Sequence, residues 1–356
     1  MRSEFVGLRA GWAICATLLL SVWPCAYASD DTEAAAEPES DFVEITPKHE
    51  QAIDRALDWL AKNQAKDGSW SSDGATGTYQ MAMTGLAGLA ILSAGPSPGR
   101  GKYSECVLRA IRFVLRNQDH DGLFTTRNDG QQMYGHGFAM TFLSEAYGMD
   151  IGGELTKEAK EKLTRAVRKT QQAQSVRGGW YYSPNSGADE GSVTITQVQA
   201  LRSARNAGIE VPDKVINQAL DYVRKSQNPD GGIRYSVNSG QTSSVALTAA
   251  GVEVFLMAGQ YAADQTKKAC DYLKTNLDPR RTQGYHDFYT NFYGSQAMYQ
   301  IGGHYWTDYF ERMRDRLLRS QANDGSWRGD VGTTYGTAIG VLILSLPYRY
   351  LPIFQK

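Results

Sequence analysis

Side chains able to do acid–base or hydrogen-bonding chemistry gather at, or just before, the starts of strongly apolar segments of this chain. Phenol, imidazole and carboxyl groups in such a set could orient a polar ligand group, move a proton or line a cavity with aromatic rings. The starts of buried helices would add positive dipole ends, which attract anions or polarised oxygens. The candidate residues are Tyr79, Tyr134, His136, Asp189, Glu190, His286, Asp287, Tyr289, Asn291, Asp330 and Tyr335.

A structural interpretation of the same residues stays open. They can also serve as helix caps, as hydrogen-bond partners of loops and as packing rings. As a set, tyrosines, histidines and acids around one opening are typical of a ligand-binding mouth. We therefore expect them to line the rim of a cavity, although the sequence singles out no catalytic residue.

Motifs of other common chemistries are missing from the sequence. The five histidines form no His-Glu-x-x-His pair, and no phosphate-binding loop, nucleophile elbow or EF-hand loop occurs. We therefore expect neither a bound metal nor a cofactor. With 37 basic and 38 acidic residues, the chain has no basic surplus that would favour nucleic acid as a partner.

A recurring octad indicates that the positions of these residues are set by an internal repeat. It reads NQAKDGSW at residues 63–70, and later copies place their glutamines 53 to 56 residues apart before one gap of 94. That gap is nearly twice the period, so a degraded copy is expected near residue 275. Gly in each Asp-Gly turn is free to adopt a positive φ. We expect the Trp to fold back on the neighbouring repeat, as a staple. The glutamines are Gln64, Gln118, Gln174, Gln227 and Gln321.

Each octad ends a helical segment with one charged face and precedes a segment that is apolar on all sides. Residues 157–169 (KEAKEKLTRAVRK) represent the first kind, and residues 81–92 (MAMTGLAGLAIL) and 335–346 (YGTAIGVLILSL) the second. Amphipathic helices lie outside and uniformly apolar helices are buried. Six of each predict an all-α protein, a closed (α/α)6 toroid of six helical hairpins. The inner helices would begin at one mouth, where the candidate residues lie.

The motif Gln-x-x-Asp-Gly-x-Trp at the end of an outer helix resembles the repeat of the prenyltransferase and squalene-oxidase family. That family includes squalene–hopene cyclases, oxidosqualene cyclases and the β subunits of protein prenyltransferases. The resemblance covers residues 48–347. It implies a terpene cyclase-like toroid with an apolar or isoprenoid-like ligand in its central cavity.

The cyclase motif of that family is not found in this chain. The cyclases protonate an alkene with Asp-x-Asp-Asp, in which neighbouring groups keep the central acid protonated. Asp189 and Glu190 come nearest, but Ser192 and Val193 stand where the last two acids belong.

The zinc ligands of the protein prenyltransferases are also missing. Thr242, Ser244 and Thr290 align with the Asp, Cys and His that bind zinc in those enzymes. We therefore expect no zinc-dependent thiol prenylation and no stoichiometric zinc in the purified protein.

The two ends of the chain suggest export and a single folded domain. Residues 1–28 resemble a secretory signal peptide, with an apolar run that is followed by Ala26-Tyr27-Ala28. Residues 29–47 hold seven acids and no base, which is typical of a disordered linker. Residues 348–356 would form a C-terminal tail. We expect an exported monomer, periplasmic, envelope-associated or secreted, without a transmembrane span in the mature chain.

Three functions remain open. The first is a cavity that binds an apolar or isoprenoid-like small molecule, with or without residual cyclase-like chemistry. The second is a non-catalytic scaffold whose mouth docks an envelope protein. The third is a toroid-type polysaccharide lyase, in which acids and an arginine such as Arg177 would hold an acidic sugar. A deep aromatic hole would favour the first, a filled centre the second, and an open groove rich in acids and arginine the third.

Overall fold

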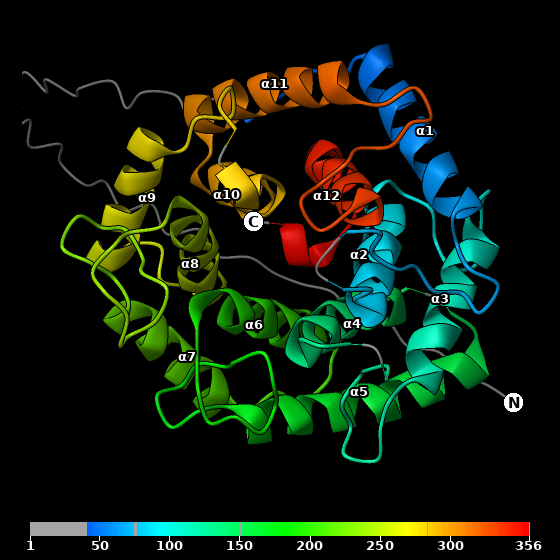
Figure 1. The fold of residues 1–356 in the computed structure, drawn as a ribbon, viewed down its shortest axis with the longest axis horizontal. Coiled ribbons are helices and arrows are strands. Elements are labelled where there is room, and N and C mark those ends of the chain that lie inside the picture. Colours follow the sequence, from blue (N-terminus) through cyan, green and yellow to red (C-terminus); the bar gives the residue numbers. More distant parts are fainter. Residues whose placement is uncertain (1–40, 75–76, 128, 150, 283, 356) are drawn as a thin grey trace, which may run out of the picture. The chain divides into compact units, whose positions relative to one another are not determined.

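The described residues of the computed structural model form twelve α-helices arranged as six hairpins (Figure 1). These residues are 41–74, 77–127, 129–149, 151–282 and 284–355, so the predicted signal peptide lies outside them. The outer helices are α1 (Pro47–Lys62), α3 (Ser104–Arg116), α5 (Gly153–Ala173), α7 (Asp213–Lys225), α9 (Asp264–Asn276) and α11 (Gly303–Ser320). The inner helices are α2 (Gln80–Ser93), α4 (Gln132–Tyr147), α6 (Gly191–Asn206), α8 (Val245–Met257), α10 (Asp287–Ile301) and α12 (Thr333–Ser345).

The apolar pattern of each helix determines its layer. In α3, Val107, Ala110, Ile111 and Val114 form one buried stripe at helical spacing. In α2, every residue from Met81 to Ser93 is buried, because outer and inner neighbours cover all its sides. Each inner helix packs on the next, and α12 packs on α2, which closes the ring. The predicted all-α toroid is confirmed, and the described residues contain only isolated β-bridges instead of strands.

The octad tryptophans hold the two helices of their own hairpin together. The indole Nε1 of Trp327 donates to the carbonyl of Leu317 on α11 at 2.9 Å, and its backbone N–H donates to Thr337 Oγ1 on α12 at 3.0 Å. Trp70 and Trp180 make the same pair of bonds in their hairpins. The predicted staple therefore exists, but the prediction that the Trp joins neighbouring repeats was wrong.

The contact between repeats is made instead by the Gln and Gly of the octad. Gln64 Nε2 donates to Gly68 O of its own loop and to Cys106 O on the next outer helix, both at 2.9 Å. Gly68, at φ +93°, lies so close to that helix that a Cβ would stand 2.3 Å from Arg109 O. Only Gly fits such an approach. The other four octads repeat this arrangement.

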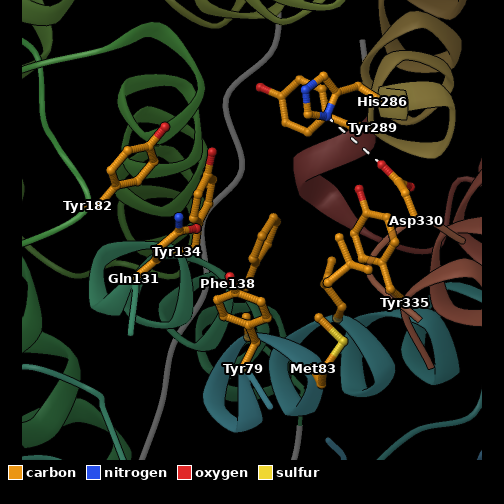
Figure 2. Close-up of a pocket in the computed structure, with 13 residues that line it drawn as sticks. Tyr79, Met83, Gln131, Tyr134, Phe138, Tyr182, His286, Tyr289, Asp330 and Tyr335 are labelled. Atoms are coloured by element: carbon orange, nitrogen blue, oxygen red, sulfur yellow. Dashed lines mark ion pairs between the residues drawn. The ribbon is translucent and has the colours of Figure 1, made fainter. Parts of the chain in front are cut away.

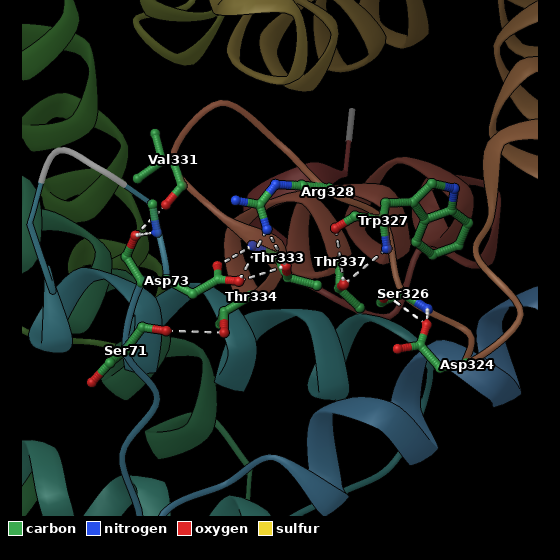
Figure 3. A network of polar contacts seen from close by, with 12 residues as sticks. Ser71, Asp73, Asp324, Ser326, Trp327, Arg328, Val331, Thr333, Thr334 and Thr337 are labelled. Carbon is green, nitrogen blue, oxygen red and sulfur yellow. Dashed lines mark hydrogen bonds and ion pairs between the residues drawn. The ribbon is translucent and has the colours of Figure 1, made fainter.

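The same contacts join the last repeat to the first. Gln321 Nε2 donates to Ala52 O on α1 at 2.8 Å, which brings α11 and α1 together. At the mouth, Asp73 of the first repeat accepts hydrogen bonds from the backbone N–H and the hydroxyl of Thr333, at the start of α12 (Figure 3). Arg328 adds an ion pair to Asp73 at 3.3 Å. The ring is thus closed by noncovalent bonds at both the loop and the mouth.

The degraded octad, at the end of α9, uses a different link. Leu277 caps α9 at the position where Gln174 and Gln321 cap their helices, and a Cβ on Gly284 would meet no atom within 4 Å. Arg316 of α11 reaches this loop instead, donating to Pro279 O at 3.2 Å and Arg281 O at 3.3 Å. A guanidinium with several donors can replace the missing amide.

Both ends of the described chain are packed against the ring. Asp41, assigned to the disordered linker, accepts from the backbone N–H of Gly303 at 2.7 Å, and Val43 is buried. The predicted tail forms η3 (Pro352–Phe354), in which Ile353 and Phe354 are buried. η3 packs on α6 in the centre of the ring, because its apolar side chains gain from burial there (Figure 1). None of the described helices is long and apolar enough to cross a lipid bilayer.

Candidate functional site

A cavity of about 250 Å³ opens at the mouth where the inner helices begin (Figure 2). Side chains from α2, α4, α10, α12 and the loops before them surround it, so the closed ring itself positions the site. Aromatic and aliphatic groups make up most of its lining, with few polar groups among them. The lining residues are Tyr79, Ala82, Met83, Leu86, Gln131, Tyr134, Phe138, Tyr182, His286, Tyr289, Asp330, Val331 and Tyr335.

The structure brings together six of the eleven candidates from the sequence. The residues that share the cavity are Tyr79, Tyr134, His286, Tyr289, Asp330 and Tyr335. Tyr182 was missed, although its ring faces the opening and its hydroxyl lies 2.8 Å from that of Tyr235. Met83 and Phe138 were missed as well, because they lie on apolar helix faces whose periodicity indicates only burial.

Asp330 is the one carboxyl group among the described residues of the lining. Its side chain is 13 % exposed, and its Oδ2 lies 3.9 Å from His286 Nδ1. Its Oδ1 is buried and makes no hydrogen bond. Burial raises the pKa of Asp330, because a low-dielectric surrounding disfavours the charged form; nearby Asp287 acts in the same direction and His286 opposes it.

Tyr134 connects the cavity to a buried acid. Its hydroxyl lies 2.5 Å from Ser192 Oγ, which in turn donates to Glu190 Oε2 at 2.6 Å. Glu190 is fully buried and also accepts from the backbone N–H groups of Ser192 and Val193 as the N-cap of α6. Burial raises the pKa of Glu190. Glu190, which was predicted at the rim, therefore caps α6 behind the cavity. Hydrogen bonds through Ser192 and Tyr134 connect it to the lining.

His136 does not reach the cavity, contrary to the prediction. It is fully buried between α4 and α5, where Nδ1 accepts from Phe124 N–H at 3.0 Å and Nε2 lies 2.9 Å from Thr170 Oγ1. The first bond places the proton on Nε2. His136 thus does what Thr337 does for Trp327: it fastens the octad aromatic to the inner helix. Substitution of His136 is therefore expected to lower the stability of the fold, as for a buried packing residue, instead of altering only the cavity.

The remaining three candidates also have structural roles. Asp189 is buried and forms an ion pair with Arg177 Nε at 2.8 Å. Asp287 forms an ion pair with Arg316. Asn291 accepts from Tyr309 OH at 2.9 Å and donates to the Asp287 carbonyl at 2.8 Å. Their partners lie on outer helices or loops, so these side chains serve the ring wall instead of the cavity.

Burial of His136 predicts a measurable loss of stability in acid. Desolvation lowers the pKa of His136 to about 4, below the ordinary value of 6.5. The unfolded chain then takes up a proton more readily than the folded one, so the contribution is complete above pH 6.5 and is lost as pH falls towards 4. The loss should approach 3 kcal/mol, since each pKa unit is worth about 1.4 kcal/mol.

The comparison of wild type with His136→Thr isolates this contribution. Threonine is the residue that the three tryptophan octads use at this position, whereas His136 serves the octad that ends in Phe124. Urea unfolding between pH 4 and 8 should show wild type losing its advantage over the variant as the pH falls. Parallel pH profiles for the two proteins would show that His136 titrates equally in the folded and the unfolded states, contrary to this prediction.

Residues aligned with the family's zinc ligands are engaged in local helix contacts. Ser244 caps α8 by accepting from Leu247 N–H at 3.3 Å, and Thr290 Oγ1 donates to His286 O at 2.8 Å. Across the described part of the chain, no group of three or more His, Cys, Asp or Glu side chains could hold a metal ion.

Neither a protein-family model nor a curated protein matches the sequence. Among solved structures, the type II terpene cyclase MstE from Scytonema is 15 % identical, covers 85 % of this chain and 99 % of its own, and superposes with a TM-score of 0.60. A protein from Actinoplanes is 16 % identical over 85 % of this chain and 99 % of its own, with a TM-score of 0.55.

A second enzyme class shares the same architecture. The α-1,6-mannanase GH76A of Salegentibacter sp. HEL1_6 is 9 % identical, covers 83 % of this chain and 98 % of its own, and has a TM-score of 0.60. At such identities the likeness concerns the fold and leaves the chemistry open. Its helices, its closed ring and these neighbours show that the chain has the α/α-toroid fold, which the terpene cyclase and the mannanase share.

Proposed function

We propose that this toroid binds a small apolar, isoprenoid-like molecule in the cavity at its mouth. The observation that carries this proposal is the lining, in which five tyrosine rings join Met83, Leu86, Phe138 and other apolar groups around one opening. Apolar ligands gain free energy in proportion to the area they remove from water. An open cavity with such a lining favours binding of a small molecule. The alternative, a non-catalytic scaffold that docks an envelope protein, was expected to have a filled centre.

The size of the cavity limits the ligand. Sites for drug-sized molecules usually measure about 300–1,000 Å³, so a cavity of about 250 Å³ suits a short ligand. MstE binds geranylgeranyl dihydroxybenzoate, a longer molecule, in the same fold. That likeness supports an isoprenoid-like ligand here, and the cavity volume favours a shorter chain.

We infer binding and not alkene cyclisation as the main role. The cyclase acid motif is missing, and Ser192 and Val193 at its position belong to the capped start of α6. The N-terminal signal-like sequence supports work outside the cytoplasm, where an apolar small molecule would need a carrier or receptor.

A glycan ligand is the second candidate, supported by the mannanase neighbour in its complex with α-1,6-mannotriose. Tyrosine rings can also stack on sugars. Glycoside hydrolysis, however, generally needs two carboxyl groups about 5–10 Å apart, and Asp330 is the single carboxyl in the described lining. Lyase action on an acidic sugar would need a cation there, yet Arg177 pairs with Asp189 behind the rim. Titration with neutral and acidic oligosaccharides separates these alternatives.

Filling the cavity should abolish binding of a short isoprenoid alcohol. Ala82 lies in the lining on α2 and is 4 % exposed, so Ala82→Phe places a ring in the ligand's space. In calorimetric titrations with geraniol, we expect wild type to bind and the variant to lose at least about tenfold in affinity, or 1.4 kcal/mol. Ala262→Phe, at an exposed turn, is the matched control and should bind like wild type. Equal binding by all three proteins would place the ligand elsewhere.

A further inference from the structure

The charges around the cavity are strongly one-sided. Asp330 contributes a carboxyl group, and no lysine or arginine is found among the described lining residues. The nearest guanidinium on the same loop, that of Arg328, is turned to Asp73 and is 70 % exposed. Behind Tyr134, Glu190 adds a second buried acid. An anionic ligand group would therefore meet acids, and the imidazole of His286, 3.9 Å from the carboxyl of Asp330, is the one basic group among the described lining residues.

The aromatic lining has the same electrostatic preference. The faces of phenol rings are electronegative and attract a cation that lies within about 6 Å of the ring centre. Tyr79, Tyr134, Tyr182, Tyr289 and Tyr335 surround the opening, with the carboxyl of Asp330 beside Tyr335 (Figure 2). Rings of this kind can replace the hydration shell of a weakly hydrated cation at a small cost in free energy. A strongly hydrated ion would lose more free energy on leaving water than the rings return.

Two unsatisfied oxygens point to the polar part of the ligand. Asp330 Oδ1 and the Tyr289 hydroxyl are buried and lack hydrogen-bond partners in the structure. Buried polar atoms are normally paired, so each such atom needs an explanation. A cationic group beside Asp330 Oδ1 would supply this buried oxygen with the partner that it lacks.

We propose that the ligand of this cavity carries an alkylammonium group, held among the tyrosine rings and against Asp330. The inference rests on the proposed function and specifies its ligand: a compact apolar body with one positive charge. Carboxylates, phosphates and acidic sugars are expected to bind less well there, because the described lining has a carboxyl group and no lysine or arginine.

The test uses two probes of nearly equal shape, one cationic and one neutral. Choline carries a trimethylammonium group, and 3,3-dimethylbutan-1-ol replaces its nitrogen by carbon and so removes the charge. Calorimetric titration at pH 8 lies about four units above the ordinary pKa of an aspartate, which favours the ionised form of Asp330 although burial raises its pKa. We expect wild type to bind choline about tenfold more tightly than the neutral isostere, which corresponds to 1.4 kcal/mol.

Four variants assign the preference to the proposed groups. Asp330→Asn should bring the ratio of the two affinities to about one, while Asp308→Asn, which removes a charge from outer helix α11, should leave the ratio unchanged. Tyr289→Leu should reduce the ratio, and Tyr289→Phe should restore it because the ring face is retained. A wild-type preference for the neutral probe would overturn the alkylammonium proposal but leave apolar binding intact. Failure of geraniol and of both probes to bind would overturn the proposed function as well.

Discussion

Replacing Trp327 by alanine is expected to lower the free energy of unfolding by about 3–5 kcal/mol, the usual cost of truncating a buried tryptophan. The ring is 2 % exposed and lies against Gly340 of α12. Its indole N–H holds the last turn of α11, and that bond is lost together with the packing. Since whole domains are stable by roughly 5–15 kcal/mol, this one change should remove a large share of the total.

Urea unfolding followed by helical circular dichroism measures the effect. Trp327→Phe, which keeps most of the ring but loses the donor, should cost less than Trp327→Ala. Tyr335→Phe at the cavity provides the comparison, because it removes only a hydroxyl and should stay within about 0.5 kcal/mol. A Trp327→Ala protein that unfolds like wild type would show that the octad aromatic contributes little to the hairpin.

Gly325→Ala should cost about 2–5 kcal/mol through a different mechanism. Gly325 has φ +93°, where a side chain costs roughly 1–2 kcal/mol, and its added Cβ would stand 2.5 Å from Arg55 O on α1. Relieving that clash adds about 1–3 kcal/mol. The backbone of the last repeat would have to move away from the first, so the substitution should weaken the contact between the Gly325 loop and α1 that closes the ring.

Gly208→Ala separates the two contributions. Gly208 has a similar φ of +81°, but a Cβ there would meet no atom within 4 Å. It should therefore show the conformational cost alone, at about 1–2 kcal/mol. If the two variants unfold at the same urea concentration, the close approach of Gly325 to α1 does not stabilise the ring.

The fold could be predicted from the sequence because the octad occurs five times and the helical periodicity recurs in all six hairpins. Each hairpin needs an outer amphipathic helix, a Gly turn and an inner apolar helix, and all three leave clear patterns. The docking of η3 in the centre of the ring could not be predicted, because three apolar residues in a short terminal segment show no period.

The candidate site was only half predicted, and helix geometry explains the errors. Successive residues of an α-helix are about 100° apart, so positions two apart point to nearly opposite sides. Tyr134 faces the cavity, and His136, two residues later, faces α5. Tyr289 likewise faces the cavity while Asp287 and Asn291 face the ring wall. Proximity to a helix start was therefore insufficient to identify cavity residues, because the helix face of each residue also decides where its side chain lies. Tyr182 lies in a loop, where the sequence has no periodic pattern that could indicate its orientation.

The segment that ends in η3 occupies the centre of the ring on α6, where Phe354 meets Phe292 edge-on at 6.3 Å. A toroid with an open bore could exchange its contents from either side, whereas in this ring the C-terminal segment lies at the centre. We therefore expect the proposed ligand to enter and leave through the mouth alone, so that a competitor enters only after the bound molecule has left. Release should consequently set the pace of exchange, at a rate that stays constant however much competitor is added.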